Sequence, residues 1–210
     1  MRHCQSLVNH LVLLCALSAL LMSAGCATVD QKVNLGYAPF DRSFGRHSGT
    51  IVVSRIDPAR PAPRSEKGEW LIGSLNNVHG VRQADITSDR NLAEWTTDAL
   101  ILELKQAGYT VTQAQAMPSA TPRGLIISDI ESFTNVNSGV VTDELKHELR
   151  FTVTLIKNGD KVKTFGVASR DNRLLPLRVS KAEQEKILLL SLQDAMKQVI
   201  PEIITFMSQT

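Results

Sequence analysis

The sequence has few aromatic residues and almost no excess charge, and both deficits exclude classes of function. Aromatic side chains make up 5% of the 210 residues, so composition argues against stacking on sugars or bases as the main activity. The formal net charge is +2, whereas proteins that bind nucleic acids carry a basic patch or stripe. We therefore predict no nucleic-acid partner, and no docking on anionic lipid by charge alone.

Known catalytic signatures are missing as well. The sequence contains no Gly-x-Ser-x-Gly elbow and no phosphate-binding glycine loop. Glu144 and His147 stand three positions apart beside an alternating strand, which points them to opposite faces and argues against a metal site. Asp129 and Glu131 alternate onto one strand face, where solvent exposure explains them better than acid–base chemistry. We therefore expect no enzyme activity, no metal and no cofactor.

The chain also has few cysteines, and all of them lie near the N-terminus. They are Cys4, Cys15 and Cys26. If the chain is cut before Cys26 and that thiol is modified, the mature protein keeps no free thiol and no disulfide. Such a protein suits an oxidising compartment, where a stray thiol is a liability.

The N-terminus has the three parts of a secretory signal. Arg2 supplies a positive start, an apolar run follows from Leu11 to Leu21, and small residues lead to Gly25 and Cys26. Small residues that end on a cysteine resemble a bacterial lipobox. This resemblance implies cleavage between Gly25 and Cys26, with a covalent diacylglycerol and an N-acyl chain on Cys26. By analogy, Ala27 in the next position favours sorting to the outer membrane, facing the periplasm.

Three other interpretations compete with lipidation of Cys26. The run from Leu11 to Gly25 has 15 residues, whereas a membrane-spanning helix needs roughly 20. A soluble export signal would make Cys26 incidental, and a buried core helix rarely opens a chain behind a lone arginine. We favour lipidation because the three parts of the signal occur together.

The predicted organisation has three parts: a signal peptide over residues 1–25 that is removed, the lipidated Cys26 with a flexible tether over 26–48, and a periplasmic domain over 49–210. Gly36, Pro39 and Gly45 break any periodicity in the tether. The 185 residues that remain after cleavage suffice for one domain and its tether.

Strand signals recur along the predicted domain. They cover residues 50–56, 70–73, 81–86, 109–112, 123–133, 147–155 and 161–169. Residues 147–155 alternate between apolar and polar, and Asn158-Gly159 after them predicts a hairpin turn. Residues 172–179 are predicted to be irregular.

Two long helices are predicted. The first opens at Asn91, with Glu94 at the capping-box distance, and ends at Gly108. Its expected core face contains Leu92, Trp95, Ala99 and Leu102. Ser180 and Glu183 form the capping box of the second helix, which Pro201 is expected to kink or break.

These elements predict an α+β fold: a single mixed, mostly antiparallel β-sheet with both long helices on one face. The strand, helix and strand over residues 81–112 suggest some parallel pairing. The other face of the sheet would then be open to solvent or to a partner.

The run from Ile72 to Tyr109 carries a family resemblance. It contains Ile-Gly-Ser-Leu-Asn-Asn-Val-His-Gly at residues 72–80, then Asp-Ile-Thr, Trp-Thr-Thr-Asp-Ala-Leu and Ala-Gly-Tyr. This run resembles the YajG-type family of bacterial lipoproteins, which is similar in layout to LptE-like and PqiC-like outer-membrane lipoproteins. The resemblance implies a small accessory lipoprotein of the envelope, and it supplies no catalytic residues.

The functional hypothesis is a non-enzymatic binding module, anchored in the outer membrane, that docks an envelope protein. The alternative is an accessory for lipid or glycolipid handling, suggested by the apolar stretches Ile187–Leu190 and Ile203–Phe206. Hydrolase activity is a weaker third idea. The candidate partner-binding residues form a basic loop, for which mere solvation is the alternative explanation. They are Arg55, Arg60, Arg64 and Lys67.

Overall fold

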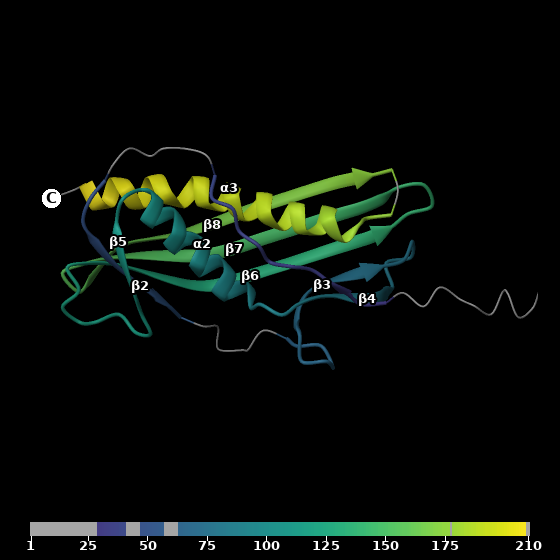
Figure 1. The fold of residues 1–210 in the computed structure, drawn as a ribbon, viewed down its shortest axis with the longest axis horizontal. Coiled ribbons are helices and arrows are strands. Elements are labelled where there is room, and N and C mark those ends of the chain that lie inside the picture. The colour runs from purple at the N-terminus through teal and green to yellow at the C-terminus, as the bar shows by residue number, and fades with distance from the viewer. Residues whose placement is uncertain (1–28, 41–46, 57–62, 177, 209–210) are drawn as a thin grey trace, which may run out of the picture.

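The computed structural model describes residues 29–40, 47–56, 63–176 and 178–208. These residues form one eight-stranded sheet and two helices, which confirms the predicted α+β class. The strands are β1 (Gln31–Lys32), β2 (Thr50–Arg55), β3 (Trp70–Asn76), β4 (Arg82–Ser88), β5 (Thr110–Ala114), β6 (Arg123–Ser138), β7 (Asp143–Lys157) and β8 (Asp160–Leu175). The helices are α2 (Leu92–Gln106) and α3 (Lys181–Ser208), labelled as in Figure 1.

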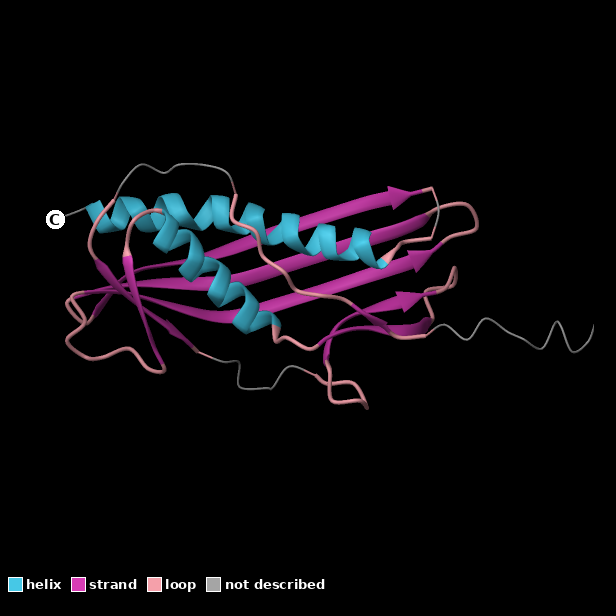
Figure 2. Cartoon of the chain, in the orientation of Figure 1, coloured by secondary structure: helices cyan, strands magenta, loops and turns pink. Residues whose placement is uncertain are grey.

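Three long strands, β6, β7 and β8, form an antiparallel meander that makes up the broad part of the sheet (Figure 2). They pair along nearly their whole lengths of 16, 15 and 16 residues. The predicted hairpin joins β7 to β8, with positive φ angles of 53° at Asn158 and 87° at Gly159. β8 continues to Leu175, so the prediction of irregular structure from residue 172 is wrong for its first four residues.

The opposite edge of β6 pairs with two short strands placed end to end. β2 pairs in parallel with residues 124–127 of β6, and β3 pairs in parallel with residues 134–137. Between these stretches Asp129 has a φ angle of 52°, and the register with β7 shifts between Ser128 and Glu131. This bulge means that Asp129 and Glu131 do not alternate along one regular strand face, as the sequence had predicted.

Within the described part of the chain, four of the seven strand pairings are parallel: β1–β4, β2–β5, β2–β6 and β3–β6. The prediction of a mixed sheet is confirmed, but the prediction that it is mostly antiparallel is wrong. Hairpins have local turn signals, whereas parallel neighbours are joined by long crossovers that leave no such signal. The strand after α2, β5, pairs with β2 and not with β4, which precedes the helix.

Both helices lie on one face of the sheet, as predicted (Figure 1). The side chain of Asn91 caps α2 by accepting from the N–H of Ala93 at 2.7 Å. Gly108 follows the helix with a φ angle of 100°, the conformation that glycine adopts most easily. Leu102, predicted to face the core, is instead exposed, and its neighbour Glu103 is buried.

Helix α3 is continuous through Pro201, so the predicted break does not occur. Proline removes one backbone hydrogen bond at the i−4 carbonyl, yet Ile200 directly before it and Ile203 two residues after it are fully buried. Val199, Ile200 and Ile203 hold the helix against the sheet, and this packing offsets the lost bond. The predicted N-cap is confirmed, because the N–H of Glu183 donates to Ser180 Oγ at 3.2 Å.

Residues 29–40, expected to be part of a flexible tether, pack along the domain instead. β1 pairs with β4, and the side chains of Val33, Leu35 and Phe40 are buried in the common core. The sequence suggested a short edge strand over residues 33–37 of this tether, whereas the strand covers Gln31–Lys32. Gly36 and Pro39 break the periodicity that a longer element would show.

A buried carboxylate on α2 holds this N-terminal segment in place. Glu103 is 1% exposed and accepts hydrogen bonds from the Tyr37 hydroxyl and, at 3.2 Å, from the N–H of Phe40. Burial raises the pKa of the Glu103 carboxyl, because the interior disfavours its charged form, and the two donors oppose this shift. Trp95 adds a bond from its indole Nε1 to the carbonyl of Gly36 at 3.2 Å.

We expect Tyr37→Phe to lower the free energy of unfolding by about 1–3 kcal/mol, because a buried carboxylate loses a donor. Urea denaturation at neutral pH measures this loss. In the Glu103→Gln background the same substitution should cost clearly less, because the two side chains interact directly. Fully additive losses in this double-mutant cycle would contradict the assigned contact.

Candidate functional site

The two faces of the meander differ sharply in what covers them. The inner face lies under the helices, and the apolar residues of α3 are buried against it. Among them are Ile187, Leu188, Ile203 and Phe206, which belong to the two stretches that suggested lipid handling. These side chains are therefore part of the core of the domain.

The outer sheet face is the face opposite the helices. In register, it consists of alternate residues from β6, β7 and β8 together with Ser74 and Asn76 from β3. From β6 it contains Glu131, Phe133, Asn135 and Asn137; from β7, Glu144, Lys146, Glu148 and Arg150; and from β8, Arg170, Asn172 and Leu174.

A hydrogen-bond network runs across four strands of the outer sheet face. Asn76 Nδ2 donates to Asn137 Oδ1 at 2.9 Å, and Asn137 Nδ2 donates to Glu144 Oε2 at 3.2 Å. The other oxygen of Glu144 accepts from Asn172 Nδ2 at 3.2 Å. Lys146 also pairs with Glu144 at 2.7 Å and is the main cause of the lowered pKa of that carboxyl. The network fixes side chains that would otherwise be mobile on an open face.

One carboxylate of this face is held between two arginines. Glu148 Oε1 accepts from Arg170 Nε at 2.6 Å and from Arg150 Nε at 2.5 Å. These bonds, first that of Arg170, lower the pKa of the Glu148 carboxyl. Exposed ion pairs contribute little to stability, so the value of this arrangement lies in placing two guanidinium groups on the face.

Phe133 on β6 lies beside this carboxylate, because it pairs with Glu148 in the register of β6 and β7. Its side chain is 48% exposed, and no other Phe, Tyr or Trp side chain within the described residues is as exposed. A shallow hollow of about 340 Å³ borders Phe133 and is also lined by Lys146, Arg170 and Asn172. A smaller hollow of about 160 Å³ lies on the side of Glu131 and Arg150. The outer sheet face thus presents one aromatic side chain that borders two hollows, each lined mainly by charged and polar residues.

The structure separates the residues of the predicted basic loop. The Arg64 guanidinium lies 3.8 Å from the ring centre of Trp70 and donates to the carbonyl of Gly68 at 2.8 Å. Lys67 pairs with Asp30 at 3.5 Å, and Arg55 ends a different strand, β2. Arg60 lies outside the described residues. Arg64 and Lys67 therefore already make contacts within the molecule.

The predicted cleavage and lipidation residues, Gly25 and Cys26, lie outside the described part of the chain, so their roles remain predictions. The same holds for the signal peptide over residues 1–25. No helix within the described residues is long and apolar enough to cross a membrane.

Glu144 and His147 point to opposite faces of β7, as the three-residue spacing predicted. Glu144 belongs to the outer sheet face, whereas His147 is 2% exposed on the inner side. The Nδ1 atom of His147 lies 3.0 Å from Thr134 Oγ1, and its Nε2 atom has no hydrogen-bond partner among the described residues. In the part of the chain that the structure describes, no group of three potential metal ligands comes together.

Burial lowers the pKa of His147 to about 4 from its usual 6.5, because the interior disfavours the imidazolium. The unfolded chain therefore binds a proton between these values that the folded protein does not. We expect the stability of the fold to decrease as pH falls from 6.5 to 4, with a contribution from His147 of up to about 3 kcal/mol.

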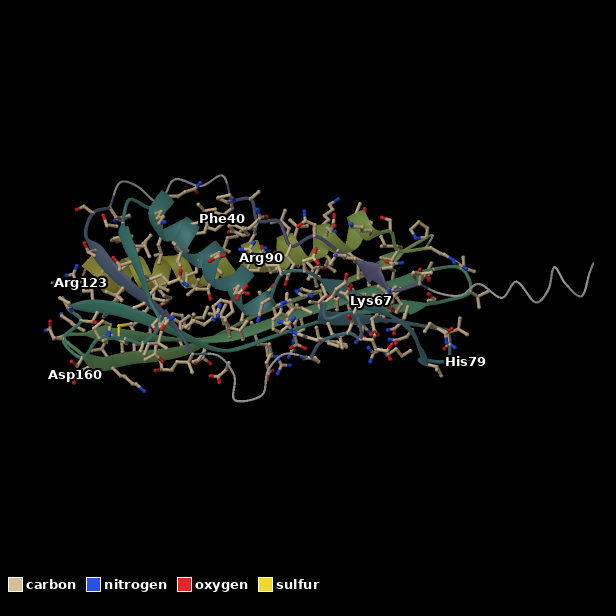
Figure 3. The ribbon with its side chains drawn as sticks, turned by 60° about the horizontal axis from the view of Figure 1, so that its bottom comes forward. Phe40, Lys67, His79, Arg90, Arg123 and Asp160 are labelled. Atoms are coloured by element: carbon tan, nitrogen blue, oxygen red, sulfur yellow. The ribbon has the colours of Figure 1, made fainter. Side chains whose placement is uncertain are left out.

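The test compares urea unfolding of the wild type, His147→Gln and the control His79→Gln across this pH range. His79 lies in an exposed turn between β3 and β4 (Figure 3). The His147→Gln profile should be flatter than that of the wild type, and the His79→Gln profile should stay parallel to it. A wild-type slope that His147→Gln leaves unchanged would contradict the assignment.

Comparison with known proteins finds similarity in fold but not in sequence. No protein-family model matches the sequence, and no curated protein matches it. The crystal structure of a DUF330-family protein from Xanthomonas campestris is similar with a TM-score of 0.54, at 11% identity, over 87% of this chain and 100% of that chain. At this identity the similarity shows a shared fold and no activity.

Two lipoproteins of known structure are similar at lower scores. Rare lipoprotein B from Shewanella oneidensis has a TM-score of 0.36 at 16% identity, over 65% of this chain and 92% of that chain. A minor lipoprotein from Acinetobacter baumannii has a TM-score of 0.40 at 14% identity, over 67% of this chain and 92% of that chain. These scores carry no argument about function, and membership of the YajG-type family stays a prediction.

Phe133 was not among the candidate site residues predicted from the sequence. The alternation of Phe133, Asn135 and Asn137 continues past the predicted strand end at residue 133. A strand extended through these residues would have placed them on one face, with one aromatic among amides.

Proposed function

We propose that the protein is a non-enzymatic accessory lipoprotein of the bacterial cell envelope, which docks an envelope protein on its outer sheet face. The lipobox that ends on Cys26 supports an anchor in the outer membrane, facing the periplasm. The fold shared with a DUF330-family protein is compatible with this role and adds no detail to it. The protein would act by binding and not by turnover.

The observation that carries this proposal is the exposure of Phe133 on the uncovered face. Residues that dominate binding energy at interfaces are enriched in aromatic side chains and arginine. Phe133 lies beside Glu148, which holds Arg150 and Arg170, so an aromatic anchor and two guanidinium groups share one surface. Burying Phe133 under a partner would remove apolar area from water, and the surrounding ion pairs would form the polar rim.

The fixed network around Phe133 favours a protein partner. Side chains that are already ordered lose little conformational entropy on binding, which makes a flat polar surface usable for recognition. The alternating charges of Lys146, Glu148 and Arg170 would select a partner with the complementary order of charges.

The alternative, handling of a lipid or glycolipid, has less support. This hypothesis was suggested by the apolar character of Ile187–Leu190 and Ile203–Phe206. Burial of Ile187, Leu188, Ile203 and Phe206 in the core accounts for most of that character. Detection of co-purified lipid on the domain by native mass spectrometry would support this alternative.

The docking proposal is tested with a photo-crosslinking amino acid at position 133 in cells that make the full-length protein. The matched control carries the same amino acid at Leu102, which is 38% exposed on α2, away from the outer sheet face. We expect a discrete protein adduct from position 133 and none from position 102.

Adding Arg170→Glu should reduce the adduct at position 133 about 10-fold or more, because it reverses a charge within the expected interface. The thermal midpoint should hardly change, since Arg170 is exposed. No adduct at position 133, or the same adducts at both positions, would overturn the proposed docking face.

A further inference from the structure

The tip of the domain is the end of the sheet where the β3–β4 turn, the β6–β7 turn and the last residues of β8 come together. The register fixes this: Asn76 pairs with Asn137, and Asp143 pairs with Leu175. His79 in the β3–β4 turn marks the tip in Figure 3, and Asp160 lies at the opposite end of the sheet.

The described chain also begins at the tip. β1 runs parallel to β4, with Gln31 beside Ile86, so the residues before Gln31 run back towards Arg82, where β4 starts. Asp30 is fixed there, because its Oδ1 accepts from the N–H of Asp85 at 3.0 Å. Val29 therefore lies near the tip.

The distance from the predicted anchor to this end is short. Two residues, Ala27 and Thr28, separate Cys26 from Val29, and the three steps along the chain span at most about 11 Å when fully extended. The chain beyond is bound to the domain, for example through the N–H of Val33, which donates to the carbonyl of Thr87 at 2.9 Å. An acylated Cys26 would therefore hold the tip close to the bilayer, without a long spacer.

The tip gathers most of the exposed apolar side chains. Of the ten large hydrophobic side chains that are exposed in the described residues, six lie at this end. They are Val29, Val78, Val81, Val140, Val141 and Leu174. Monomeric soluble proteins rarely concentrate exposed apolar residues in this way unless the region meets a partner or a membrane.

The β6–β7 turn is the most exposed part of the tip. Val140 and Val141 are 93% and 78% exposed, and residues 138–142 contain no charged side chain. The N–H of Gly139 donates to the carbonyl of Thr142 at 3.0 Å, which closes a tight turn with both valines at its apex. Such an apex can enter the boundary between headgroups and acyl chains without moving a charge out of water.

We propose that the tip, led by Val140 and Val141, docks on the surface of the bilayer that holds the anchor. This inference rests on the acylation of Cys26 within the proposed function. It assigns an orientation to the domain: the tip faces the lipid, and the long strands of the meander rise away from it. The short covalent connection and the apolar apex both lead to this orientation.

The test uses the processed full-length lipoprotein in vesicles of phosphatidylethanolamine and phosphatidylglycerol. A single cysteine, Val140→Cys, carries an environment-sensitive fluorophore, and Val162→Cys carries it in the matched control. Val162 is 50% exposed on β8, close to the end opposite the tip. We expect the emission at position 140 to shift to shorter wavelength and to be quenched by nitroxide-labelled lipid, with neither change at position 162.

A second variant replaces Val141 with Asp in the labelled Val140→Cys protein. It should reduce both the shift and the quenching, because a carboxylate resists entry into the boundary region. Thermal unfolding should be unchanged, since both side chains are mostly exposed.

Mass spectrometry of the same samples separates failure of this inference from failure of the proposed function. If the protein is acylated and the fluorophores at positions 140 and 162 both show neither an emission shift nor quenching, the tip docking alone is overturned. A protein without acyl chains on Cys26 would overturn both the anchor and the orientation derived from it. Crosslinking at Phe133 tests the docking of a protein partner independently.

Discussion

The structure depends on one strand, β6, which pairs with three others. One edge pairs with β7 over almost its whole length, and the other edge pairs first with β2 and then with β3. The bulge at Asp129 separates these two short parallel pairings, so β6 joins the β2–β5 pair and the β1–β4–β3 unit to the meander. The close approach of β3 requires Gly73, since a side chain there would meet the carbonyl of Thr134.

Burial of polar groups follows from this arrangement. Glu103 on α2 and His147 on the inner side of β7 both lie out of water, and Glu103 contacts the N-terminal segment through Tyr37 and Phe40. Glu103 ties the N-terminal segment to α2, whereas His147 remains neutral beside Thr134. Polar groups on the opposite side stay at the surface, where they are ordered by one another and not by packing. The same strands therefore give the protein a rigid core and an ordered, uncovered face.

Local signals in the sequence predicted the helices, their caps and the β7–β8 hairpin, because each depends on a few adjacent residues. Asn91, Gly108, Ser180 and the Asn158-Gly159 turn are such cases. Pairings between strands far apart in the sequence depend on no such local group of residues. Two strands and a helix lie between β2 and β5 in the chain, and no residue pattern in either strand indicates that they pair. The exposure of Phe133 was equally hidden, since alternation divides a strand into two faces without showing which one the helices cover.

The length of the meander sets a scale for the proposed arrangement. Strands of 16 residues at about 3.3 Å each are roughly 50 Å long, so the β7–β8 hairpin would stand that far from the lipid. Phe133 lies five residues before the end of β6, which gives it a height of about 17 Å. A protein that reaches Phe133 would therefore project from the membrane or rest on it, and one confined to the middle of the periplasm would meet only the far half of the sheet.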